Sequence, residues 1–186
     1  MSSSAARRAK AQQEKLQRQL EREPLVFDFK YDPRVLQGLG PIINTDLTVN
    51  AAHRDALQQA GQPIPPPVRC RFLIDTGSDA TVVKHDFADK AGLKLINASA
   101  PLHGVGVDTT GRVYIGRILF TLESKIAQGA MHSIFVDTQV RSGNLASDRI
   151  DGLIGRDVLT HFTLTCDGRS GLVTMRYHRP AVPVTP

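Results

Sequence analysis

The segment Phe72-Leu-Ile-Asp-Thr-Gly-Ser-Asp-Ala-Thr-Val-Val83 is the most informative part of this sequence. An apolar run leads directly into Asp75, and a carboxylate at the end of a buried strand loses solvation free energy unless hydrogen bonds compensate. Gly77 lets the backbone approach that carboxylate closely, and Ser78 can donate its hydroxyl to it. A simple Asx turn would explain Asp75 and Gly77, but it explains poorly the apolar residues on both sides.

A second informative segment, Ile150-Asp-Gly-Leu-Ile-Gly-Arg-Asp-Val-Leu-Thr-His-Phe162, lies far downstream. Two apolar residues precede Gly155, and Arg156 and Asp157 open a short helix. Taken alone, this pattern predicts a strand, a turn and a helix and indicates no function. The two segments become specific when they are considered as an ordered pair.

As a pair, Leu73-Ile-Asp-Thr-Gly-Ser78 and Leu153-Ile-Gly-Arg-Asp-Val-Leu159 resemble the motifs of the retropepsin-type aspartic proteases, in their single-lobed cellular or bacterial branch. Between them, Leu102-His-Gly-Val-Gly-Val-Asp-Thr-Thr-Gly-Arg-Val-Tyr-Ile115 occupies the place of the family's glycine-containing flap hairpin. The resemblance covers residues 41–178. It implies an all-β fold, namely a closed retropepsin-like barrel lobe with a flap hairpin and one or two short helices.

The resemblance also implies which residues form the active-site turn. Asp75 is the expected catalytic residue, and Thr76, Gly77 and Ser78 are expected to support the turn around it. Viral relatives usually carry alanine at the position of Ser78, whereas serine resembles the pepsin-like branch. Since an extra hydrogen bond to a carboxylate favours its charged form, Ser78 predicts a lower working pH than in alanine-bearing relatives.

Two further groups of residues follow from the same resemblance. The family's arginine pairs with an acidic residue four positions after the catalytic aspartate, which predicts an ion pair between Arg156 and Asp79. The flap is expected to contact substrate through residues near its tip, namely His103, Gly104, Val105 and Gly106.

The chemistry of this family sets a requirement that one motif does not meet. Hydrolysis needs two carboxylates that share one proton, one acting as base toward water while the other protonates the carbonyl oxygen. Two carboxylates held that close cannot both ionise, an effect for which aspartic proteases are the standard example. The sequence contains one Asp-Thr-Gly motif, so a homodimer with two copies of Asp75 is predicted. Asp151 is a poor second carboxylate, because no Thr or Ser follows its Asp-Gly pair.

The predicted function is therefore an aspartic endopeptidase that acts on protein or peptide substrates without a cofactor or metal. An alternative keeps the fold but makes the protein a catalytically weak or inactive binding or dimerisation module. A weaker idea is that the basic N-terminal arm tethers the domain to nucleic acid. Nucleic acid is an unlikely partner, since the arm is of mixed charge and has no aromatic residue to stack on a base.

Composition and charge divide the chain into three parts. The 186 residues are 41% hydrophobic with a net charge of +5, and most of that charge lies in residues 1–22. We expect a basic, helical or flexible extension over 1–24, a protease domain over 25–178 and a Pro-rich tail over 179–186. The sequence lacks an apolar run that could span a membrane, and its two cysteines favour a reduced, cytoplasmic setting.

Local patterns predict the regular elements. Helices are expected at 5–23, 53–61, 85–91 and 157–161, and a stiff polyproline-like connection at 62–67. Turn residues separate short strands throughout the rest of the chain. Those strands are expected at 25–31, 41–50, 68–74, 80–83, 102–107, 112–122, 131–136, 150–154, 162–166 and 171–176.

Overall fold

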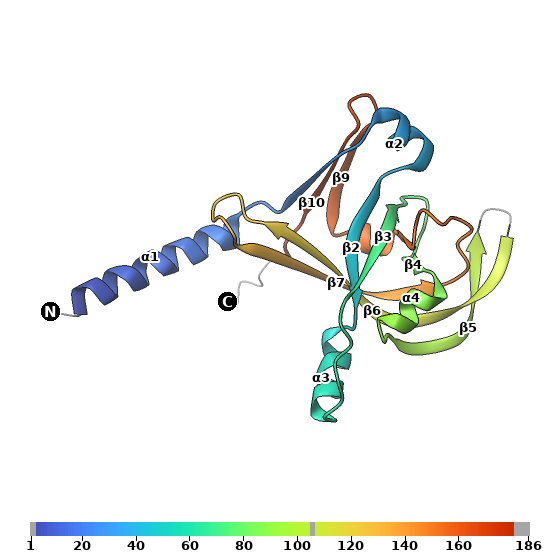
Figure 1. Cartoon of the computed structure of the whole chain (residues 1–186), viewed down its shortest axis with the longest axis horizontal. Helices are drawn as coiled ribbons and strands as arrows, with labels where there is room; N and C mark the ends of the chain where they lie inside the picture. The colour runs from blue at the N-terminus through green and yellow to red at the C-terminus, as the bar shows by residue number, and fades with distance from the viewer. Residues whose placement is uncertain (1–2, 105–106, 181–186) are drawn as a thin grey trace, which may run out of the picture.

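The computed structural model describes residues 3–104 and 107–180, and most of the regular structure is β-strand (Figure 1). The larger sheet has the strand order β2-β3-β8-β4-β7-β6-β5 and closes on itself where β2 pairs with β6. This closure confirms the predicted all-β barrel lobe. Its strands are β2 (Ile42–Thr48), β3 (Val68–Ile74), β4 (Val82–Val83), β6 (Val107–Glu123), β7 (Met131–Ser142) and β8 (Gly152–Ile154).

Two β structures lie outside the closed barrel. Strand β5 (Lys94–Gly104) pairs antiparallel with the first half of β6 and forms a long hairpin with it. A separate sheet of three strands has the order β1-β10-β9, formed by β1 (Val26–Lys30), β9 (Phe162–Asp167) and β10 (Leu172–Tyr177). In chain order, β1 of the smaller sheet precedes the barrel strands, and β9 and β10 follow them.

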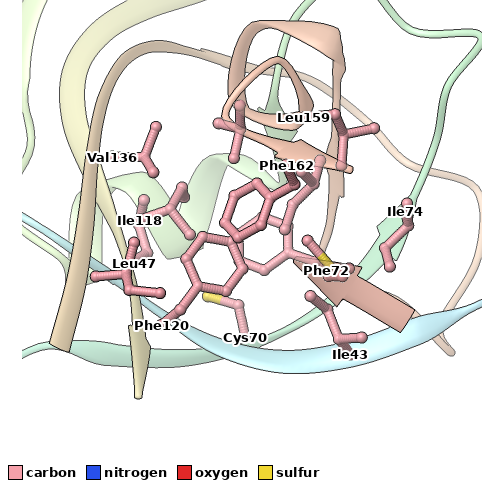
Figure 2. Close-up of a cluster of buried hydrophobic side chains, with 14 of the residues drawn as sticks. Ile43, Leu47, Cys70, Phe72, Ile74, Ile118, Phe120, Val136, Leu159 and Phe162 are labelled. Atoms are coloured by element: carbon pink, nitrogen blue, oxygen red, sulfur yellow. The ribbon is translucent and has the colours of Figure 1, made fainter. Parts of the chain in front are cut away.

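One hydrophobic core joins the barrel to the smaller sheet (Figure 2). Phe120 of the barrel lies between aromatic rings of the other sheet, with ring centroids 5.9 Å from Phe27 and 5.1 Å from Phe162. Tilted and edge-to-face aromatic pairs of this kind add about 0.5–1.5 kcal/mol each beyond the area they bury. The two sheets therefore form one packed unit.

Strand β3 owes its place in the barrel to simple alternation. Cys70, Phe72 and Ile74 point into the core and are almost fully buried. Close packing beside the strand requires residues without a side chain. A Cβ atom at Gly152 would lie 2.4 Å from the ring of Phe72, and one at Gly155 would lie 2.4 Å from the backbone of Ala80. These contacts explain why glycines flank the apolar residues of β8.

Five helices complete the described structure: α1 (Ser3–Arg22), α2 (Pro33–Leu39), α3 (Ala51–Gln59), α4 (His85–Lys90) and α5 (Arg156–Leu159). Helix α1 covers most of the helix expected at 5–23 and projects away from the barrel (Figure 1). No helix among the described residues is both long and apolar enough to cross a membrane.

Helix α2 was not expected from the sequence. The side chain of Asp32 caps it by accepting a hydrogen bond from the Arg34 N–H at 2.8 Å, and Pro33 occupies its first turn. Gly40, with φ of 73°, ends it. The cap and the stop were visible in the sequence, but the helix has seven residues and its one buried side chain, Leu36, gives no periodic pattern.

Candidate active site

Asp75 directly follows β3, at the point where that strand pairs with β8. Its backbone N–H donates to the carbonyl of Ile154 at 3.0 Å, so the pairing of the two strands continues to Asp75 itself. The N–H of Gly77 donates to Oδ1 of Asp75 at 2.9 Å. Asp75 is half-buried, whereas Thr76 and Gly77 are exposed. The turn thus holds one carboxylate oxygen with a backbone donor and presents the next two residues to solvent.

The Ser78 hydroxyl does not donate to the Asp75 carboxylate, and that expectation was wrong. It donates to the carbonyl of Ala80 at 2.7 Å. A hydroxyl has one proton to donate, and here the nearest carbonyl of the same turn takes it. Ser78 therefore stabilises the path of the chain after the turn, and the basis for a lower working pH is removed.

Arg156 braces the turn through backbone carbonyls and not through Asp79. Its Nη1 donates to the carbonyl of Thr76 at 2.8 Å and to that of Gly77 at 3.0 Å. The carboxylate of Asp79 instead lies 3.6 Å from Nη1 of Arg141 on β7. The expected ion pair between Arg156 and Asp79 is therefore replaced, because the Arg156 guanidinium binds the two carbonyls of the turn and the Asp79 carboxylate lies beside Arg141.

Sequence reasoning missed the role of Asp157, the second residue of α5. Its Oδ2 accepts from the Thr81 N–H at 3.0 Å and from Thr138 Oγ1 at 2.6 Å, while Oδ1 accepts from Thr81 Oγ1 at 2.9 Å. The N–H of Gly155 also donates to Thr81 Oγ1, at 3.3 Å. This carboxylate ties the segment after the Asp75 turn to α5 and β7. The available signal was Asp157 itself, which the sequence marked only as the start of a helix.

Comparison with protein-family models matches residues 61–158 to the aspartyl protease family. The chain belongs to this family. The match runs from the connection before β3 to α5 and so includes the Asp75 turn, the β5–β6 hairpin and β8. Together with the closed barrel, the match supports the retropepsin-like type of this family. A search of the curated proteins finds no match.

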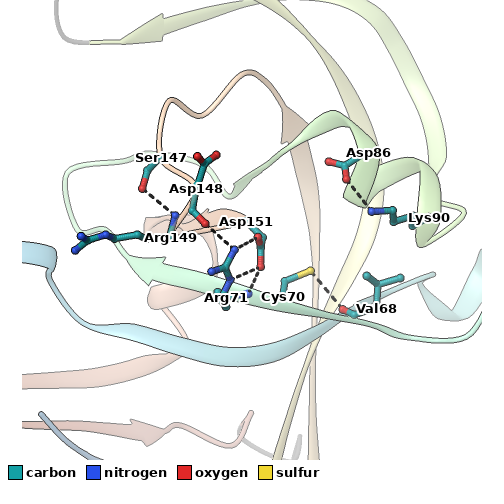
Figure 3. A network of polar contacts seen from close by, with 9 residues as sticks. All are labelled: Val68, Cys70, Arg71, Asp86, Lys90, Ser147, Asp148, Arg149 and Asp151. Atoms are coloured by element: carbon teal, nitrogen blue, oxygen red, sulfur yellow. Dashed lines mark hydrogen bonds and ion pairs between the residues drawn. The ribbon is translucent and has the colours of Figure 1, made fainter.

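In this member of the family, the Asp151 carboxylate is hydrogen-bonded to Arg71 and is not a free second carboxylate. Three hydrogen bonds reach its carboxylate, and all come from Arg71 (Figure 3). Hydrogen bonding by the Arg71 side chain is the largest cause that lowers the pKa of Asp151 below its usual range. The side chain is buried and both carboxylate oxygens accept hydrogen bonds, which agrees with the sequence argument that Asp151 is a poor second carboxylate.

The proposed flap is a β-hairpin wherever the structure describes it. After two register shifts near the start of β5, the two strands pair antiparallel without interruption from Ala100 with Gly111 to Gly104 with Val107. Two of the expected flap residues, Val105 and Gly106, lie outside the described residues. Among those that are described, no group of three or more His, Cys, Asp or Glu side chains could hold a metal ion.

Proposed function

We propose that this aspartyl protease is an active endopeptidase whose catalytic dyad consists of Asp75 from each subunit of a homodimer. The observation that carries the proposal is the Asp75 turn, in which a backbone N–H holds Oδ1 and Thr76 and Gly77 are exposed. The sequence supplies one such turn, and Asp151 is occupied by Arg71. A second copy of the chain is therefore the natural source of the second carboxylate.

The chemistry would use one proton shared by the two Asp75 carboxylates. The ionised carboxylate removes a proton from water, whose oxygen forms a bond to the peptide carbonyl carbon. The protonated partner gives its proton to the carbonyl oxygen, which leaves a neutral tetrahedral diol. When the C–N bond breaks, the amine nitrogen takes the proton of the dyad while one diol hydroxyl returns its proton to the ionised carboxylate, so that a carboxylic acid, an amine and a dyad with one proton are left. Gly77 supports the ionised form, because its N–H donates to Asp75 Oδ1.

The substrate would bind in an extended form between the Asp75 turn and the β5–β6 hairpin. An extended peptide can add backbone hydrogen bonds to an open strand edge, and pockets between alternate side chains then give specificity. We assign residues 103–111 to the segment that closes over the peptide. Thr76, which is exposed on the turn, would face the second subunit and help to brace the paired turns.

The division of the chain into three parts is also proposed. Residues 1–24 form the extension, 25–178 the protease domain and 179–186 the tail. Burial supports a junction close to Glu23, since α1 ends at Arg22 while Glu23 and Leu25 are buried. Both cysteines are free thiols, which supports a cytoplasmic setting.

Cleavage of a peptide library from about pH 3 to about pH 8 tests the proposed function, because dyad chemistry depends on pH. Wild type is compared with Asp75→Asn, and Asp46→Asn serves as a control in which an exposed ion pair on β2 is lost instead. The oligomeric state is recorded for each protein. Cleavage by dimeric wild type and by Asp46→Asn, but not by Asp75→Asn, is the expected result. A folded dimer that cleaves nothing would favour the alternative of a binding or dimerisation module.

A further inference from the structure

The position of Asp75 depends on a very short parallel pairing between β3 and β8. Three residue pairs make up this ladder, namely Phe72 with Gly152, Leu73 with Leu153 and Ile74 with Ile154. The hydrogen bond from the Asp75 N–H to the Ile154 carbonyl is the last rung. A shift of one residue would turn the buried side chains of β8 to the wrong face and move the Asp75 turn with them. So short a ladder needs something to fix its register.

Arg71 and Asp151 stand at the first rung of the same ladder (Figure 3). The Asp151 N–H donates to the Arg71 carbonyl at 2.8 Å, and the Arg71 N–H donates to Asp151 Oδ2 at 2.9 Å. The guanidinium then closes a fork, with Nε 3.0 Å from Oδ2 and Nη2 2.8 Å from Oδ1. Arg71 thus binds Asp151 through its backbone and through its side chain.

The geometry of the fork makes it sensitive to register. The Asp151 side chain is 9% exposed and that of Arg71 is 47% exposed. The buried Asp151 carboxylate therefore depends on hydrogen bonds from this arginine to compensate for its lost solvation. A planar guanidinium bound to both carboxylate oxygens fixes orientation as well as distance. Two further hydrogen bonds connect the pair to neighbouring segments. Arg71 Nη2 donates to the Asp148 carbonyl, and the Lys84 N–H donates to the Asp151 carbonyl.

We propose that Arg71 and Asp151 are positioning residues that fix the register of β3 against β8 and so place Asp75 for the second subunit. Their effect on catalysis rests on the function proposed above, whereas their effect on the Asp75 backbone does not. The pair does not touch the reacting atoms. It acts over the four positions that separate Arg71 from Asp75, along a strand whose alternate side chains are buried in the core.

Strand β3 offers a matched control for the test. Arg69 lies two residues before Arg71 on the same strand, and its Nη1 is 3.0 Å from Asp46 Oδ2 on β2. Arg69→Gln therefore removes an arginine ion pair from β3 without touching the pairing with β8. The test variants are Arg71→Gln, Arg71→Lys and Asp151→Asn. Each is assayed for kcat, KM and pH profile on a cleaved peptide, and for hydrogen exchange at the Asp75 N–H.

The proposal expects kcat to fall by about 100-fold in Arg71→Gln and Asp151→Asn, with KM changed by less than about threefold, since small displacements of a catalytic group have effects of this size. Arg71→Lys should recover part of kcat, and Arg69→Gln should match wild type. Exchange at the Asp75 N–H should accelerate in Arg71→Gln and Asp151→Asn but not in Arg69→Gln.

Two results would overturn the proposal. One is an equal loss of kcat in Arg69→Gln and Arg71→Gln, which would show a general cost of removing charge from β3. The other is unchanged exchange at the Asp75 N–H in folded Asp151→Asn. If wild type cleaves no peptide, the proposed function fails while the exchange measurement still decides the positioning role. If Arg71→Gln does not fold, Asp151→Asn and Arg71→Lys carry the same comparison.

Discussion

The carboxylate of Glu23 lies 2.9 Å from Nε2 of His132, and this contact joins the end of α1 to the start of β7. The same carboxylate accepts hydrogen bonds of 2.6 Å from Ser124 Oγ and from the Lys125 N–H in the turn after β6. Arg179, near the other end of the chain, donates to the carbonyl of Glu23 at 3.1 Å. The buried Glu23 side chain thus attaches the end of the N-terminal extension to the barrel.

Glu23 should make the attachment of α1 sensitive to acid. The hydrogen bond from Ser124, followed by that from His132, lowers the pKa of Glu23 from 4.5 to about 2. A carboxylate whose pKa is lower in the folded than in the unfolded chain stabilises the folded state at pH values above the unfolded pKa. This stabilisation is lost as the pH falls through the folded pKa. At pH 7, Glu23→Gln should therefore unfold at a lower temperature than wild type. This difference in unfolding temperature should shrink as the pH falls from about 4.5 to about 2.

Glu123 provides the control for this prediction. It is the last residue of β6, directly before the same turn, but it is exposed and accepts a 3.3 Å hydrogen bond from the Gly129 N–H. Glu123→Gln should leave the unfolding curve close to that of wild type at every pH. If the difference in unfolding temperature between Glu23→Gln and wild type stays constant down to pH 2, Glu23 is not the acid-sensitive group.

Gly152→Ala should destabilise the barrel strongly. The new Cβ would lie 2.4 Å from the Phe72 ring and 2.7 Å from the Val82 carbonyl. Neither the buried ring nor the backbone can move aside without disturbing the core. We expect the free energy of unfolding to fall by about 3 kcal/mol, as measured in urea, because overpacking of a rigid core has a cost of this order. Gly168→Ala is the control, since nothing lies within 4 Å of its Cβ position. Equal stability of the two variants would contradict the close packing of β8.

The sequence predicted best the elements whose pattern is local. Strand β3 was placed at its observed bounds, because its alternation is clean and it is bounded by proline on one side and Asp75 on the other. Strand β5 was expected to begin at residue 102 but begins at Lys94. Residues such as Asn97 and Ser99 obscure its pattern, and its pairing with β6 contains two register shifts.

The candidate site shows the same division between local and long-range information. Asp75 and Gly77 lie where the motif placed them, since the turn is set by neighbouring residues. The partner of Arg156 was predicted wrongly, because the choice between Asp79 and the carbonyls of the turn depends on how α5 packs. The fork between Arg71 and Asp151 was missed because the two residues are 80 positions apart and meet only when β3 and β8 pair.

Ser78→Ala should leave the pH profile of peptide cleavage unchanged. The hydroxyl of Ser78 donates to Ala80 and not to the Asp75 carboxylate, so its loss removes no stabilisation of the ionised dyad. A decrease of about 1 kcal/mol in the free energy of unfolding is expected from the lost hydrogen bond. The profile of kcat/KM against pH, measured beside wild type, checks this. A shift of its limbs would show that the serine turns toward Asp75 when the dimer forms.

Arg156→Gln should reduce kcat without unfolding the protein. The guanidinium holds the carbonyls of Thr76 and Gly77, the two exposed residues of the turn, and a shorter amide cannot reach both. Since the paired turns must meet across the dimer, we expect a fall in kcat of about 10- to 100-fold. Arg156→Lys, which keeps the charge but not the planar geometry, should be intermediate.

Two further measurements separate this bracing role from a general effect of charge. Arg149→Gln removes an arginine whose side chain is exposed in the loop before β8, and it should retain the kcat of wild type. Sedimentation equilibrium at several protein concentrations then shows whether Arg156→Gln still dimerises. A dimeric variant with a low kcat would indicate a misplaced turn, and a monomeric one would indicate that the turns themselves hold the subunits together. Wild-type kcat in Arg156→Gln would contradict both readings and leave the placement of Asp75 to β3 and β8 alone.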